Sequence, residues 1–182
     1  MRFQLTNKKL NEIKADLELI FVVDKNIKHK FIKDEKAFKF ANYKGDNVLL
    51  LLESGRIYVP LSKLGYDELR IAAAKAYNAV KSLNVKSIKL ASYLAGCQKM
   101  SFQALTEGFL LGAYEFNKYK EKKEKYALKD IIFSKEEYND KEVRENDAQD
   151  GFAHGEIIAS ATNFTKDIVN EIPEIYTPQK MA

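Results

Sequence analysis

The chain has 182 residues, a formal net charge of +4 at pH 7, a hydrophobic fraction of 46% and a charged fraction of 31%. This length is enough for one ordinary domain of roughly 100–150 residues and leaves little room for two. No run of about 18 apolar residues occurs that could span a bilayer, and the small net charge does not by itself indicate a nucleic-acid partner.

The start of the chain and its cysteine content bear on the cellular compartment. The first residues, Met1-Arg2-Phe3-Gln4-Leu5, lack the charged and then apolar pattern of a signal peptide. Cys97 is the single cysteine, so no intrachain disulfide can form. We therefore expect a cytoplasmic protein that is not associated with a membrane.

The first third of the sequence predicts β-strands. Residues 17–23 begin with alternating polarity and become continuously apolar, which is typical of a strand that is covered on both faces. Residues 48–52 and 57–59 are two further apolar runs, and the polar segment 53–56 between them predicts a hairpin.

From Asp67 onward the apolar period changes to that of a helix. The apolar side chains on one stripe of this helix are Leu69, Ala72, Ala73, Ala76, Val80 and Leu83. A strand over 87–91, a helix over 101–117 and a strand over 128–133 follow. This βαβαβ order predicts an α/β fold with parallel strands and right-handed crossovers.

The last fifty residues predict a long helix after a polar segment. Ser134 has the spacing of a capping box, but residues 134–150 show no apolar face, and we interpret them as a loop or frayed helix. Apolar residues then recur every three or four positions, at Ala153, Ile157, Ala161, Phe164, Ile168 and Ile172. Pro173 ends this pattern, and a helix of such length, on the order of 30 Å, is expected to reach beyond the domain.

No segment carries a recognisable catalytic or ligand-binding motif. His29 and His154 lack the spacing of metal ligands, and the polar run 146–151 lacks the late Glu of a calcium loop. Cys97 is interpreted as a small packing residue, and the lysines and tyrosines of 118–126 as a solvated helix end rather than a phosphate-binding groove. We therefore predict no catalytic, cofactor-binding or metal-binding residue in this chain.

Two glycines inside the second predicted helix need a structural explanation. Gly108 and Gly112 each cost a helix about 1 kcal/mol relative to alanine. Because they are four residues apart, they lie on the same helix face and remove two side chains from it. We expect this face to approach the sheet closely.

Two segments resemble a known family, the cytosol leucyl aminopeptidases. The first lies in residues 107–120 and holds Glu107-Gly108, Gly112, Tyr114-Glu115-Phe116 and Tyr119-Lys120. It is similar to a signature of the family's amino-terminal domain. The second is Lys166-Asp167-Ile168-Val169-Asn170, which is similar to the family's Arg-Asp-Leu-x-Asn segment before the catalytic domain, with Lys166 in place of the usual Arg.

The resemblance implies a fold and a domain organisation. The family's amino-terminal domain is a macro-like three-layer α/β/α sandwich with a mixed, largely parallel sheet and a long C-terminal linker helix. It implies a macro-like domain over 1–150, a linker helix over 151–172 and the start of the catalytic domain over 173–182. Thr177 and Pro178 form a helix start signal with only a few residues after it, so we expect a chain cut at the domain junction.

The resemblance also implies a function for the longer parent protein. The parent would be a hydrolase that removes amino-terminal residues from peptides with two divalent cations, manganese or zinc, held in its catalytic domain. This chain alone is expected to be inactive and to contribute to hexamer architecture and to active-site access. Alternatives are a stand-alone module that binds a nucleotide or ADP-ribose, and a DNA-binding domain.

Overall fold

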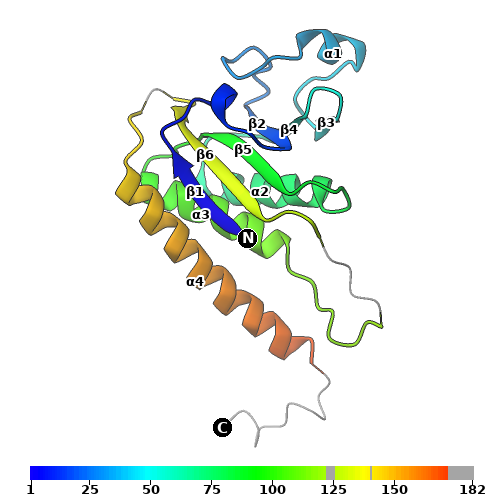
Figure 1. The fold of residues 1–182 in the computed structure, drawn as a ribbon, viewed down its shortest axis with the longest axis vertical. Coiled ribbons are helices and arrows are strands. Elements are labelled where there is room, and N and C mark those ends of the chain that lie inside the picture. The colour runs from blue at the N-terminus through cyan, green and yellow to red at the C-terminus, as the bar shows by residue number, and fades with distance from the viewer. Residues whose placement is uncertain (122–125, 140, 172–182) are drawn as a thin grey trace, which may run out of the picture.

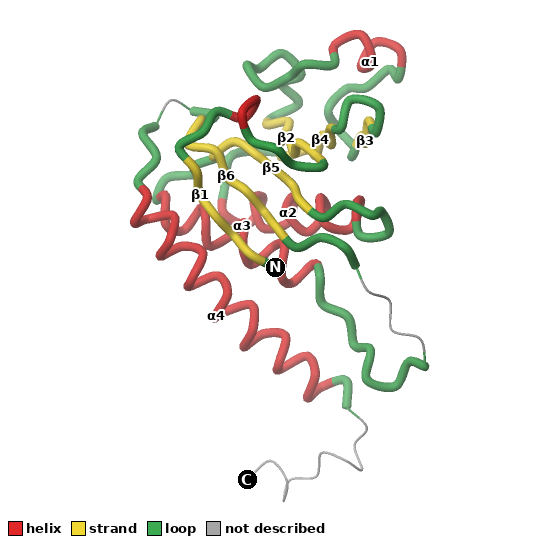
Figure 2. The backbone as a smooth tube through the Cα atoms, viewed as in Figure 1, coloured by secondary structure: helices red, strands yellow, loops and turns green. Residues whose placement is uncertain are grey.

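The computed structural model describes residues 1–121, 126–139 and 141–171, and within them six strands form one sheet (Figures 1 and 2). The strands are β1 (Arg2–Thr6), β2 (Leu17–Val23), β3 (Leu49–Leu51), β4 (Arg56–Leu61), β5 (Ser87–Ser92) and β6 (Asp130–Glu137). Their order is β1-β6-β5-β2-β4-β3, and all neighbours are parallel except β3 and β4. The predicted mixed, largely parallel sheet and the hairpin are therefore confirmed.

The helices lie on both faces of this sheet. They are the 3-10 helix η1 (Leu10–Glu12), α1 (Glu35–Phe40), α2 (Tyr66–Val80), α3 (Gln98–Gly112) and α4 (Glu145–Val169). The crossovers through α2 and α3 run in one direction along the sheet, and those through η1 and α1 run in the other. Because such crossovers are right-handed, α2 and α3 cover one face, while η1 and α1 lie on the opposite face.

The centre of the sheet forms the core. All seven residues of β2 are buried, because β4 and β5 flank the strand and both layers cover its faces. The continuously apolar segment of the sequence is thus the most enclosed strand. Among the described helices, none combines the length and apolarity needed to cross a membrane.

The α3 glycines approach a helix rather than the sheet, so the predicted partner was wrong. A Cβ atom on Gly108 would lie 2.2 Å from the carbonyl oxygen of Arg70 in α2, and one on Gly112 would lie 3.0 Å from the Cα atom of Ala74. The sheet-facing side of α3 carries large buried residues instead, such as Phe102. The close approach itself was predicted correctly.

The segment after Phe133 also differs from the prediction. Ser134 belongs to β6 and does not start a helix, because this segment pairs with β1 and the Ser134 hydroxyl donates to the carbonyl oxygen of Lys8 at 2.8 Å. Helix α4 begins at Glu145, within the stretch interpreted as a loop or frayed helix. Its first half packs beside α3 and β1, and its second half extends past the sheet (Figure 1).

Candidate functional site

The two segments that carried the family resemblance contact each other at the end of α4. The Tyr114 hydroxyl donates to Asp167 Oδ1 at 2.8 Å and accepts a hydrogen bond from Asn170 Nδ2 at 3.3 Å. Lys166 Nζ lies 4.9 Å from the centroid of the Tyr114 ring, close enough for a cation–π interaction. Segments more than fifty residues apart in the sequence therefore form one structural junction.

A buried carboxylate strengthens this junction. Glu171, two residues after the end of α4, is only 9% exposed, and Lys118 Nζ and the Tyr119 hydroxyl both bind its carboxylate. A carboxylate can be buried at low cost when it is paired with a cation and hydrogen-bonded. The contact ties the end of α4 to the segment that follows α3.

A hollow of about 320 Å³ lies beside this contact. It is lined by Phe116, Asn117, Lys118, Phe164, Asp167, Ile168 and Glu171. Three of these residues are apolar, namely Phe116, Phe164 and Ile168, and the other four are polar or charged.

The face of α4 that packs against α3 carries small residues where the two helices come closest, together with Phe152, whose ring lies 5.3 Å from that of Phe102. A Cβ atom on Gly151 would lie 2.6 Å from the carbonyl oxygen of Lys99, and one on Gly155 would lie 2.7 Å from Thr106 Cβ. Both distances are too short for a side chain, so the two helices are in backbone contact. We call this the inner face of α4.

The opposite side of α4 carries the predicted apolar stripe, and it is open to solvent. The outer stripe consists of Ala153, Ile157, Ala161, Phe164 and the partly exposed Ile168, and Ile172, the last residue of the predicted stripe, lies outside the described residues. Ile157 is 67% exposed and Phe164 is 62% exposed. A soluble domain rarely leaves large apolar side chains together on one helix face without a binding partner.

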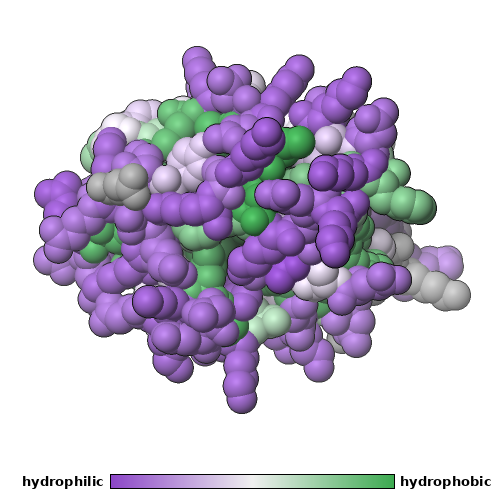
Figure 3. All heavy atoms as spheres, turned by 90° about the horizontal axis from the view of Figure 1, so that it is seen from above, coloured by the Kyte–Doolittle hydropathy of each residue, from purple (hydrophilic) through white to green (hydrophobic). Residues whose placement is uncertain are grey.

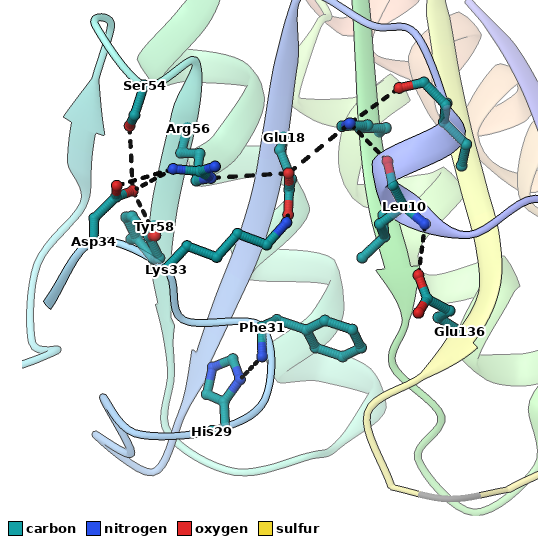
Figure 4. Close-up of polar contacts among 12 residues, drawn as sticks. Leu10, Glu18, His29, Phe31, Lys33, Asp34, Ser54, Arg56, Tyr58 and Glu136 are labelled. Atoms are coloured by element: carbon teal, nitrogen blue, oxygen red, sulfur yellow. Dashed lines mark hydrogen bonds and ion pairs between the residues drawn. The ribbon is translucent and has the colours of Figure 1, made fainter.

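A second polar group lies on the sheet face that is covered by η1 and α1 (Figure 4). Arg56, Glu18 and Lys89 are direct neighbours on three adjacent strands, and we call them the charged row. Glu18 is 5% exposed and pairs with Lys33 Nζ at 2.7 Å, Arg56 Nε at 3.8 Å and Lys89 Nζ at 3.9 Å. Glu18 stands inside an otherwise apolar strand, and this feature of the sequence could have predicted a buried ion pair, but the sequence analysis did not consider it.

The charged row holds the covering segments on the sheet. Asp34, from the loop before α1, accepts hydrogen bonds from Arg56 at 2.9 Å and from the Tyr58 hydroxyl at 2.8 Å. Burial raises the pKa of Asp34, but these hydrogen bonds outweigh it and the pKa is lowered overall. Lys89 donates to the carbonyl oxygen of Leu10 at 2.7 Å, and burial lowers the pKa of the Lys89 ammonium.

The charge pairing argues for a structural role of this row. Glu18 in the row is paired with cations, and the neighbouring Asp34 is bound by Arg56 and the Tyr58 hydroxyl. The described residues include no group of three or more His, Cys, Asp or Glu side chains that could hold a metal ion. We therefore assign the row to folding.

The histidines considered in the sequence analysis lie far from the junction hollow. His29 is half-buried between Phe31 and Tyr138, its Nδ1 accepts from the Phe31 amide at 3.3 Å, and burial lowers its pKa to about 4. His154 is exposed on α4, with Nδ1 2.7 Å from the carbonyl oxygen of Asp150. Neither belongs to a ligand-binding cluster in the described part of the chain.

The other candidate segments also have structural explanations. Residues 146–151 form the first turns of α4, where Asp147 pairs with Arg144 at 2.7 Å and Asp150 pairs with Lys99 at 3.9 Å. Cys97 is exposed at the N-cap of α3, so its interpretation as a packing residue was wrong. Of the basic segment 118–126, residues 122–125 lie outside the described residues.

Comparison with known proteins identifies relatives over the whole chain. The profile described as "Cytosol aminopeptidase family, N-terminal domain" matches residues 61–123. A probable cytosol aminopeptidase of Campylobacter jejuni is 50% identical over 182 residues, which is 100% of this chain and 38% of that protein. A probable cytosol aminopeptidase of Wolinella succinogenes is 33% identical over 175 residues, which is 95% of this chain and 36% of that protein.

Solved structures show the same fold in larger proteins. A tomato leucine aminopeptidase mutant superposes with a TM-score of 0.74 at 15% identity, over 99% of this chain and 40% of that one. The bottromycin maturation enzyme BotP superposes with a TM-score of 0.66 at 20% identity, over 91% of this chain and 35% of that one. The chain thus spans less than half the length of each of these proteins.

Proposed function

The chain belongs to the cytosol aminopeptidase family and corresponds to its amino-terminal domain. We propose that it is the non-catalytic domain of a cytoplasmic metal-dependent peptidase. The longer protein would remove amino-terminal residues from peptides. The single observation that carries this proposal is the 50% identity to the Campylobacter jejuni protein along all 182 residues. At this identity over all 182 residues, common ancestry and a common role are the simplest explanation.

Catalysis is assigned to the part of the longer protein outside these residues. Two divalent cations, manganese or zinc, would activate water and polarise the scissile carbonyl there. The described residues do not fit such a group, since they contain no cluster of metal-ligating side chains. Asp147 and Asp150, the nearest imitation of a ligand set, are already paired with basic residues.

The domain organisation follows from the position of α4. We propose that residues 1–150 form the body of the domain, that 151–172 form the linker helix and that 173–182 begin the catalytic region, with 172–182 lying outside the described residues. The boundary at 150 falls inside α4 (Glu145–Val169). The role of α4 as a linker is supported by its arrangement, because the glycine contact holds its first half on the body while its second half extends away (Figure 1). A contribution to hexamer architecture and to active-site access belongs to the same proposal.

The alternatives from the sequence are not favoured. The relatives found over the whole chain are aminopeptidases rather than nucleotide-binding modules. DNA binding was considered for the 118–126 segment, yet Lys118 binds the Glu171 carboxylate within the junction. A macro-like fold alone would not establish either activity.

An activity assay tests the proposal. The purified 182-residue chain should hydrolyse no aminoacyl amide when manganese or zinc is supplied. The longer gene product should hydrolyse it, and a chelator should abolish that activity. Chelator-sensitive turnover by the 182-residue chain, or an inactive longer product loaded with either metal, would contradict the proposal.

A further inference from the structure

We propose that the outer stripe of α4 and the adjacent hollow form the docking surface for the catalytic region of the same polypeptide. The inference depends on the proposed function, because it requires a longer protein with such a region. It adds the residues that make the contact and the partner that covers them.

The first argument is that the described domain leaves this surface unused. Ile157 and Phe164 are 67% and 62% exposed, while Ala159 on the inner face is fully buried. All three belong to the same helix, so the difference is set by which face meets α3. The outer stripe lies away from α3 and from the sheet.

The second argument is that the surface has the shape of a binding site. The outer stripe leads into the hollow of about 320 Å³, because Phe164 and Ile168 belong to both. Asp167 and Lys118 stand at the hollow with opposite charges. A row of apolar anchors that ends in a pocket with both apolar and polar lining residues is an arrangement seen where one protein surface covers another.

The third argument concerns the identity of the partner. The segment matched in the Campylobacter jejuni relative accounts for 38% of that protein, and the matching profile describes an N-terminal domain, so most of the relative's polypeptide follows the matched part. By the proposed division, the catalytic region begins at residue 173 and continues beyond residue 182. Glu171 lines the hollow, so the surface ends two residues before that region along the chain.

The fourth argument is that the docking surface is held in place before any partner binds. Gly151 and Gly155 set the first half of α4 against α3, and Glu171, bound by Lys118 and Tyr119, fixes the other end of the helix. A rigid surface loses little conformational entropy on docking. A partner joined by a short connection also has a high effective concentration, which favours the same polypeptide over a second copy.

Labelling of an engineered cysteine tests whether the surface is covered. Phe164→Cys, in a Cys97→Ser background, should react quickly with a maleimide in the 182-residue chain and at least tenfold more slowly in the longer gene product. Phe40→Cys is the matched control, because Phe40 is 96% exposed on α1. Figure 3 looks down on the α1 end of the molecule, where hydrophilic side chains surround small hydrophobic areas, and this control should react equally in both proteins.

The outcomes separate this inference from the proposed function. Equal labelling of Phe164→Cys in both proteins would overturn the docking surface, even if the longer protein is an active aminopeptidase. Protection that disappears on dilution would assign the surface to a second copy and would also overturn it. Protection that persists in longer protein diluted until it runs as a monomer in size-exclusion chromatography supports docking within one polypeptide. The proposed function is judged separately by the turnover of the unmodified longer protein.

Paired substitutions provide a second measurement. Ile157→Ser with Phe164→Ser should leave the melting temperature of the 182-residue chain nearly unchanged, but should separate the unfolding of the longer protein into two transitions. The control pair Phe40→Ser with Leu52→Ser, at residues that are 96% and 62% exposed, should do neither. A single unchanged transition in the longer stripe variant would contradict the inference.

Discussion

The two faces of α4 differ in the size of their side chains more than in their polarity. The inner face presents Gly151 and Gly155 to α3 at backbone distance, whereas the outer face exposes Ile157 and Phe164. Apart from Phe152, which is buried against Phe102, the large apolar residues of α4 therefore lie mainly on the face that the domain does not use. Glycines mark the places where α4 is held most closely against α3. Without side chains there, the two backbones come near enough to make many dispersion contacts.

The largest expected effect is on the inner face. Gly155→Leu should destabilise the domain by about 3 kcal/mol, because its side chain would enter the space occupied by Thr106 and by the Gln103 carbonyl oxygen. The free energy of unfolding from urea titration measures this. Ala161→Leu, on the outer stripe, is the matched control and should change stability by less than about 0.5 kcal/mol. Equal effects at both positions would mean that the assigned faces are wrong.

A substitution in the charged row tests whether a buried ion pair contributes as much to the free energy of unfolding as a close glycine contact. Glu18→Ala should destabilise by about 2–3 kcal/mol, since it leaves Arg56 and Lys89 without their shared carboxylate, although water still reaches part of their side chains. Glu53→Ala, at an exposed position, should be nearly neutral. Denaturant midpoints compare the two variants, and a neutral Glu18→Ala would show that the row does not hold the covering segments.

The two glycines of α3 differ in how closely they approach α2, so their substitutions should differ in how much they destabilise the domain. Gly108→Ala should destabilise by about 2 kcal/mol, because the new Cβ would lie 2.2 Å from a backbone oxygen that cannot move freely. Gly112→Ala meets Ala74 at 3.0 Å, and the gain in helix propensity of about 1 kcal/mol should offset that contact. Thermal unfolding of both variants measures the difference, and the opposite ranking would mean that α2 and α3 are packed differently.

The pH dependence of stability tests the packing of the segment between β2 and α1, which contains His29, independently of α4. The pKa of His29 is lowered to about 4 in the folded protein from its ordinary value of 6.5, so the unfolded chain binds more protons between these values. This contribution to stability is present above pH 6.5 and is lost as the pH falls toward 4. His29→Gln should reduce the dependence of melting temperature on pH in this window, and an unchanged slope would contradict the burial of the ring.

The smallest expected effect is on the outer face itself. Ile157→Ser should alter the stability of the 182-residue chain by less than about 0.5 kcal/mol, because its side chain is already 67% exposed. Equilibrium unfolding in urea is sensitive enough to exclude a larger value. A loss of 2 kcal/mol would show that the stripe packs within this domain, and it would weaken the comparison from which the docking surface was inferred.

Local sequence patterns predicted much of the fold. The apolar run of β2, the hairpin of β3 and β4 and the helical stripe of α2 depend on residues that are near one another in the chain, and the structure confirms them. The resemblance segments were also readable, because their residue types are specific. The alternation of polar and apolar residues over Arg2–Thr6 could have predicted β1, but the sequence analysis did not assign a strand there. Ser134 suggested a helix cap, whereas it lies in β6 and pairs with β1.

The sequence by itself determined that α4 is amphipathic and long, that the sheet is largely parallel and that Gly108 and Gly112 accompany a close approach. Only the tertiary structure decided that α2 is the partner of those glycines, that Glu18 joins Arg56 and Lys89, and that the outer stripe is left open. The physical reason is that periodicity reports the polarity of one element, whereas contact depends on the shape of whichever distant segment lies opposite. Neither Thr106 nor Arg70 can be assigned to a glycine until the helices are packed.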